Sequence, residues 1–180
     1  MKAKHLGTFF IFVSLISSAF TYYPFIKIYF FPKPRDISIN NSNLYLEIPK
    51  INAFSQVLIN IDPDAKLEYE SALENGVAHA KNTNLPGDGL SFIFAHSSMP
   101  PWKMTRVNTP FLRLGELEKG DTIKVYKYGE VLNFSVIEKK IVNPYDVQKV
   151  YETKEPYLIL MTCTPVGTSL RRLLVFANRV

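Results

Sequence analysis

The chain has 180 residues, enough for one domain and an appendage, and its formal net charge is +5 at pH 7. All of this net charge lies at the front, because residues 1–35 hold five basic residues and no acidic one. The remaining 145 residues hold 16 basic and 16 acidic residues. A body without net positive charge lacks the basic surface of a nucleic-acid-binding protein, so nucleic acid is excluded as a partner.

The first 35 residues predict a membrane anchor. The segment from Leu6 to Phe31 is almost wholly apolar or aromatic and exceeds the roughly 20 residues that a membrane-spanning helix needs. Lys2 and Lys4 precede it, so the positive-inside rule places the N-terminus in the cytoplasm and the body of the chain outside. The alternative is a signal peptide cleaved near Ser17-Ser18-Ala19. The apolar run continues well beyond that site, which favours an uncleaved single-pass anchor in the cell membrane.

Residues 36–43 predict a polar linker, and residues 44–180 predict one mainly β domain. Asp62 is expected to cap a short helix that has Pro63 in its first turn and stops before Gly76. A further helical turn is expected at residues 111–117. The remaining apolar runs are short and predict strands, at residues 44–48, 53–59, 90–95, 122–128, 131–137, 157–163 and 172–177. About seven or eight strands with one or two short helices indicate a closed or nearly closed β-barrel, or a sandwich.

The single cysteine, Cys163, stands at the C-terminal end of an apolar run, and Arg172 opens the next one. A cation beside a thiol favours the reactive thiolate, and it can also stabilise the oxyanion formed when a thiolate attacks a carbonyl. Arg171 is the neighbour of Arg172, and only one of the two can face the cysteine if both belong to the strand. An unpaired exported cysteine can instead form an intermolecular disulfide or be a small buried apolar residue.

Three histidines are available to assist a thiol. His5 lies in the leader, and His79 lies between the predicted helix and a loop, where a structural role is the simpler interpretation. His96 directly follows a buried strand, so it stands at a strand end as Cys163 does. A thiolate with an imidazolium is a recurrent acyl-transfer pair, in which the imidazolium protonates the leaving amine. Such a pair predicts a bell-shaped dependence of activity on pH.

The segments around these residues resemble the sortase family of membrane-anchored cysteine transpeptidases. Ile159-Leu160-Met161-Thr162-Cys163 is similar to the family's Thr-Leu-x-Thr-Cys signature and departs only at its first position. Thr164-Pro165-Val166-Gly167 and Arg172 follow in the family's order. Ala95-His96 corresponds to the family's Gly-His pair, with alanine for glycine. Three upstream segments also match in order and spacing: Leu46 to Ile51, Gly76 to His79, and Leu85 to Gly87.

The resemblance implies the closed sortase β-barrel, with Cys163 as nucleophile, His96 as general acid and base, and Arg172 as the oxyanion-stabilising or substrate-positioning residue. Thr162 and Ala95 would lie along the substrate groove, and the segment from Val142 to Pro156 would shape its pocket. The implied partners are exported proteins with a Leu-Pro-x-Thr-Gly-like sorting signal, and an amine acceptor on peptidoglycan or on another protein. No cofactor is expected.

Some sortases bind calcium through carboxylates, but this sequence does not indicate such a site. Glu68, Glu70 and Glu74 are more simply the solvated face of the predicted helix, and Asp62 its cap. We therefore expect no metal.

Two other functions are compatible with parts of the pattern. An L,D-transpeptidase would place its cysteine in a Ser-x-Gly-Cys-x-Arg setting, whereas Met161-Thr162 precedes Cys163 and Pro165 stands two residues after it. A catalytically inactive, membrane-tethered binding module with a sortase-like barrel is the non-enzymatic alternative. The presence of Cys163, His96 and Arg172 together argues against it.

Overall fold

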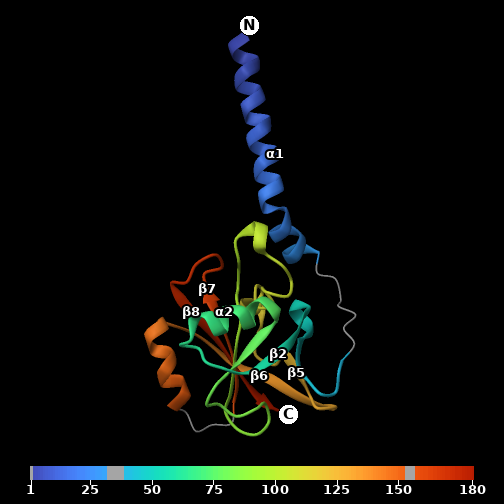
Figure 1. Ribbon diagram of the computed structural model, residues 1–180, viewed down its shortest axis with the longest axis vertical. Coiled ribbons are helices and arrows are strands. Elements are labelled where there is room, and N and C mark those ends of the chain that lie inside the picture. Colours follow the sequence, from blue (N-terminus) through green and yellow to red (C-terminus); the bar gives the residue numbers. More distant parts are fainter. Residues whose placement is uncertain (1, 32–38, 153–156) are drawn as a thin grey trace.

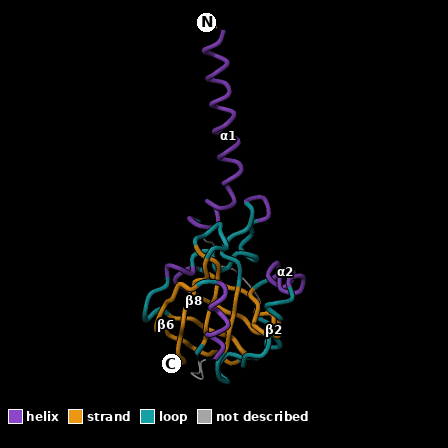
Figure 2. The backbone as a smooth tube through the Cα atoms, turned by 90° about the vertical axis from the view of Figure 1, so that its left-hand side faces the viewer, coloured by secondary structure: helices purple, strands orange, loops and turns teal. Residues whose placement is uncertain are grey.

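A computed structural model describes residues 2–31, 39–152 and 157–180. It places a long N-terminal helix, α1 (Lys2–Phe30), at one end of a β-barrel (Figures 1 and 2). The segment His5–Phe30 is long and apolar enough to cross a membrane, and it is the single such helix among the described residues. The predicted linker 36–43 falls partly outside the described residues.

Eight strands form the barrel. In chain order they are β1 (Leu44–Ile48), β2 (Ala53–Ile61), β3 (Val77–Ala80), β4 (Ser91–Phe94), β5 (Thr122–Lys127), β6 (Glu130–Val142), β7 (Leu158–Thr164) and β8 (Arg171–Arg179). Their order around the barrel is β1-β2-β3-β4-β7-β8-β6-β5, and β5 pairs with β1 to close it. The predicted closed barrel of seven or eight strands, preceded by an apolar helix, is thereby confirmed.

Two of the strand pairs are parallel, β2 with β3 and β4 with β7, and the others are antiparallel. A parallel pair requires a crossover between its strands. The helix α2 (Lys66–Asn75) supplies the crossover from β2 to β3 and packs against both strands. The remaining helical segments are short 3₁₀ helices: η1 (Pro49–Ile51), η2 (Pro101–Lys103), η3 (Leu114–Glu116) and η4 (Pro144–Glu152).

The barrel interior is filled by side chains that alternate along the strands. In β6, Leu132, Phe134 and Val136 are buried while the residues between them are at least partly exposed, as a half-buried strand requires. Ile123 and Val125 of β5 have no exposed surface. The interior is therefore a packed core, and a site for chemistry has to lie at its rim or on its outer face.

The structure corrects two predicted elements. The helix α2 begins at Lys66 rather than after Asp62, because the Asp62 carboxylate accepts a hydrogen bond from the Asp64 N–H at 3.0 Å and so forms a local turn. No strand is predicted between the helix and the loop that follows His79, but the buried strand β3 lies there and contains His79.

Candidate active site

The parallel pairing of β4 and β7 brings the histidine and the cysteine to the same rim of the barrel. Phe94 lies opposite Met161, and the Ala95 N–H donates to the Met161 carbonyl at 3.1 Å. β4 ends at this pair, whereas β7 continues to Thr164 against β8. Two residues beyond the pair on each segment stand His96 and Cys163, and both are partly exposed. Each of the two side chains is half-buried.

The antiparallel pairing of β7 and β8 adds the arginine. Cys163 lies directly opposite Arg172 in the register of these strands. The Arg172 Nη1 donates to the Ser169 carbonyl oxygen at 2.9 Å, which holds the guanidinium over the loop between β7 and β8. A guanidinium has five N–H donors, so others remain to meet a substrate or an oxyanion.

These three side chains line one open cleft of about 980 Å³, which we call the Cys163 cleft. Its walls come from α1, from α2, from the segment that follows β4 and from the loop between β7 and β8. The last two walls are joined, because the Gly167 N–H donates to the Ser98 hydroxyl at 2.9 Å. The cleft is therefore a composite of segments that are distant in the sequence.

Thr162 and Ala95 also line the Cys163 cleft, and they are joined to each other. The Thr162 hydroxyl donates to the Ala95 carbonyl oxygen at 2.8 Å, and both residues are about 95 % buried, with 4 % and 5 % of their surface exposed. This bond fixes the ends of β7 and β4 relative to each other. Because Thr162 and Ala95 are buried, they expose little surface to a ligand. Their hydrogen bond instead positions the residues that follow them, Cys163 and His96.

Burial determines the protonation of the histidine. Removal of His96 from solvent lowers its pKa, and the negative charge of Glu70 raises it by a smaller amount. Glu70 is solvent-exposed, as the sequence predicts for that helix face, but it also lines the Cys163 cleft. The neutral imidazole is thus favoured near neutral pH, where it can accept a proton.

A second cavity of about 620 Å³ adjoins the cleft over β6 and β8. Met161 lines the cleft, and its cross-strand partner Leu174 lines the second cavity. The wall of this cavity includes Val142, Val150 and other residues around η4, in the segment expected to shape the pocket. Arg171 also lines it, while Arg172 lines the Cys163 cleft, so the two arginines face different cavities.

His79 lies outside the cleft and is almost fully buried in β3. Its Nε2 donates to the Asn84 carbonyl oxygen at 2.8 Å and lies 3.0 Å from the Thr83 hydroxyl. Burial lowers its pKa, and the hydrogen bond to Asn84 offsets this only in part. The geometry agrees with the structural role that the sequence suggests.

The lowered pKa of His79 predicts a pH dependence of stability. In the unfolded chain His79 has the ordinary histidine pKa of about 6.5. In the folded protein its pKa is lower, so the buried side chain binds a proton only at lower pH. The free energy of unfolding should therefore keep its full value above about pH 6.5. It should decrease as the pH falls from there to the lowered pKa of His79. We expect His79→Gln to flatten this decrease, measured as the melting temperature of the detergent-solubilised chain at several pH values. His5→Gln, on the exposed leader helix, is the control, and equal slopes for both variants would contradict the assignment.

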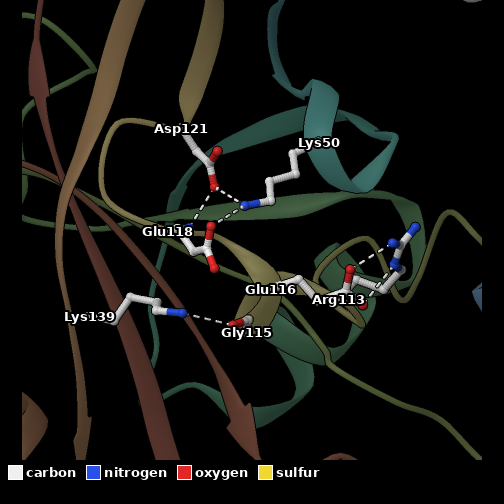
Figure 3. Close-up of polar contacts among 7 residues, drawn as sticks. All are labelled: Lys50, Arg113, Gly115, Glu116, Glu118, Asp121 and Lys139. Atoms are coloured by element: carbon white, nitrogen blue, oxygen red, sulfur yellow. Dashed lines mark hydrogen bonds and ion pairs between the residues drawn. The ribbon is translucent and has the colours of Figure 1, made fainter.

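The acidic side chains do not gather into a metal site in the described part of the chain, where no group of three or more potential ligands converges. The Lys50 amine binds the Asp121 and Glu118 carboxylates at 2.8 and 3.1 Å, and Arg113 binds Glu116 (Figure 3). Positive side chains thus neutralise the carboxylates that lie together.

A closed barrel with a thiol, an imidazole and a guanidinium at one rim is the architecture that the sequence motifs predict for sortases. A family model described as "Sortase domain" matches residues 46–180. The chain belongs to the sortase family.

Named relatives agree with this assignment. Sortase D of Bacillus subtilis (strain 168) is 32% identical over 140 residues, which are 75% of this chain and 62% of that protein. The chain thus matches less than two thirds of that relative's length. Among solved structures, the pilus-related sortase C of Group B Streptococcus has a TM-score of 0.65 and 25% identity, covering 79% of this chain and 69% of that one. Sortase A from Corynebacterium diphtheriae has a TM-score of 0.63 and 28% identity, covering 77% and 60%.

Proposed function

We propose that this protein is a cysteine transpeptidase that cleaves a sorting signal and transfers the attached protein to an amine. The observation that carries the proposal is the convergence of Cys163, His96 and Arg172 on one cleft. Residues 1–35 would anchor the chain in the cell membrane with the N-terminus in the cytoplasm, residues 36–43 would be the linker, and residues 44–180 would act outside.

In the first half-reaction His96 takes the proton of the Cys163 thiol, and the resulting thiolate attacks the carbonyl carbon of a Thr–Gly-like peptide bond. The carbonyl π electrons move to oxygen, and the Arg172 guanidinium stabilises the oxyanion. When the tetrahedral intermediate collapses, the C–N bond breaks and the His96 imidazolium donates its proton to the leaving amine. The products are a thioester on Cys163, a neutral His96 and a free amino terminus.

In the second half-reaction an acceptor amine attacks the thioester. His96 takes the proton that the nucleophilic nitrogen loses, the C–S bond breaks, and the Cys163 thiolate returns with an imidazolium beside it. The acceptor is an amine of peptidoglycan or of another protein. The second cavity next to η4 supports an extended binding groove, because Leu174 in its wall pairs across β7 and β8 with Met161 in the wall of the cleft.

The proposal is tested with the full chain in detergent micelles, a library of Leu-Pro-x-Thr-Gly-like peptides and an added amine. We expect intact-mass analysis to detect an adduct of the size of the N-terminal peptide fragment, and chromatography to detect an amine-dependent ligated product. Adduct formation without an amine product would indicate a hydrolase. Absence of an adduct with every peptide, together with a Cys163 that resists a small alkylating reagent, would contradict the proposal and favour a binding module.

A substitution of Arg172 tests its role within this mechanism. Arg172→Ala should lower kcat/KM by about 10²- to 10³-fold, because it removes donors that meet charge developing in the transition state. Arg172→Lys should restore only part of the activity, since an ammonium cannot reproduce the planar fork of a guanidinium. Arg179→Ala, at the other end of β8, is the matched control and should retain activity. Steady-state cleavage assays measure all three, and equal losses at positions 172 and 179 would contradict the role.

A further inference from the structure

The most exposed large aromatic side chain at the rim of the cleft belongs to the single tryptophan of the chain. Trp102 lies in η2 with 77% of its surface exposed, between Pro101 and Lys103. Pro100 and Pro101 beside it line the Cys163 cleft. Packing within the barrel does not account for a tryptophan at this position.

The segment η2 lies against the last turns of α1. The two elements are in contact, and Figure 1 shows the η2 segment, in yellow-green, next to the lower end of the long helix. Two residues of the helix, Tyr22 and Phe25, line the Cys163 cleft together with Pro100 and Pro101. Trp102 therefore stands at the level where α1 meets the barrel.

Exposure along α1 divides the helix into two parts. Every residue from His5 to Tyr23 is exposed, whereas Pro24, Phe25, Ile28 and Tyr29 are half-buried. Their spacing places them on one side of a helix. The barrel thus covers one stripe of the last two turns, and the preceding part is solvent-exposed on all sides.

Specific contacts hold this docked part in place. The Arg106 guanidinium donates to the Phe31 carbonyl oxygen. The Arg113 guanidinium lies 5.5 Å from the centre of the Tyr29 ring, and it is itself oriented by Glu116, whose carboxylate it binds at 2.6 Å (Figure 3). The position of the barrel relative to the helix is therefore defined by side chains as well as by the chain connection.

The exposed part of the helix matches the thickness of a bilayer. The segment from His5 to Tyr22 spans about 27 Å at the rise of an α-helix, close to the roughly 30 Å of the hydrocarbon core. The outer boundary of the bilayer then falls near Tyr22 and Tyr23, which are 57% and 58% exposed. Tyrosine and tryptophan concentrate at such boundaries, because their rings are apolar and their polar atoms reach water.

We propose that η2 contacts the bilayer that α1 crosses, with Trp102 inserted among the lipid headgroups and Lys103 beside their phosphates. The Cys163 cleft then opens at the membrane surface, with Tyr22 and Phe25 as its membrane-side wall. The inference rests on the proposed transmembrane position of α1 and not on the acyl-transfer chemistry.

The fluorescence of Trp102 tests this contact in the full chain, because no other tryptophan contributes. In vesicles of brominated phosphatidylcholine, which add no tryptophan of their own, we expect strong quenching relative to unbrominated lipid, strongest when the bromines are near the headgroups. The control is the double variant Trp102→Phe, Tyr145→Trp, which moves the reporter to the 93%-exposed position in η4, lower on the barrel (orange in Figure 1). This variant should be quenched little.

Two results would overturn the inference. Unquenched Trp102 with a water-like emission maximum would place η2 away from the lipid. Equal quenching at positions 102 and 145 would mean that the barrel lies along the membrane in another orientation. Neither result depends on a peptide substrate, so failure of this inference and failure of the proposed transpeptidase activity are distinguishable.

Discussion

Replacing Cys163 by alanine is expected to abolish the covalent adduct and to lower turnover by about 10⁴-fold or more, because nucleophile and base act as a unit whose parts fail together. Cys163 is half-buried at the end of β7, and its backbone pairs with Arg172. Alanine keeps that pairing and removes only the sulfur. Intact-mass analysis after incubation with peptide, together with cleavage kinetics, measures the effect.

The control for this experiment separates chemistry from folding. Cys163→Ala should keep the melting temperature of the unmodified protein, since the side chain lies at the rim and not in the packed interior. Cys163→Ser should also be nearly inactive, because a hydroxyl ionises much less readily than a thiol beside the same imidazole. Substantial turnover in the alanine variant would show that the cysteine is not the nucleophile.

Replacing His96 by glutamine is expected to lower kcat/KM by about 10²- to 10⁴-fold, the usual contribution of a positioned acid and base. Glutamine retains hydrogen-bonding groups of similar reach but does not exchange a proton near neutral pH. The thiol should remain reactive toward a small alkylating reagent, so alkylation of Cys163 measured by mass spectrometry serves as the control for an accessible site. Unchanged cleavage kinetics would remove His96 from the mechanism.

The pH profile of the unmodified protein gives a further test of His96. Free imidazoles titrate below free thiols, so we assign the acid limb of the kcat/KM profile to His96 and expect it below the usual value for imidazole, because burial lowers the pKa of His96. Glu70 raises that pKa, so Glu70→Gln should move the acid limb to still lower pH and reduce the plateau, since less imidazolium remains. Glu74→Gln, on the exposed side of the same helix, should leave the profile unchanged.

Local sequence signals predicted most strands and the place of the cysteine and histidine. Apolar runs of strand length end at Ala95, directly before His96, and at Cys163, so the placement of the histidine and the cysteine at strand ends followed from the pattern. The strand Val77–Ala80 was missed, because two alanines and a histidine carry little β-propensity and its existence depends on pairing with β2 and β4. Its stability is a tertiary effect that no local window contains.

The walls of the cleft were less predictable than its reactive groups. Tyr22 and Phe25 belong to an apolar run that is fully explained by membrane insertion, so nothing in that run indicates a second contact with the cleft. Glu70 was predicted only as part of a solvated helix face, and its influence on His96 arises from the way α2 packs beside the barrel. The contacts that define both features join segments far apart in the chain.

Closure of the barrel restricts how a peptide can be recognised. Since β5 pairs with β1, each described strand has a neighbour on both sides, and an extended peptide cannot add as a further strand where both neighbours are paired. The open stretch of β6 after Val136, which pairs with β8 alone, lies away from Cys163 on β7. Many peptide-binding domains obtain affinity from such main-chain pairing, which is tolerant of sequence. A peptide bound on the outer face of strands that are paired on both sides must instead be selected by side chains and loops. Discrimination between substrates should therefore evolve through the segments between the strands while the barrel itself stays constant.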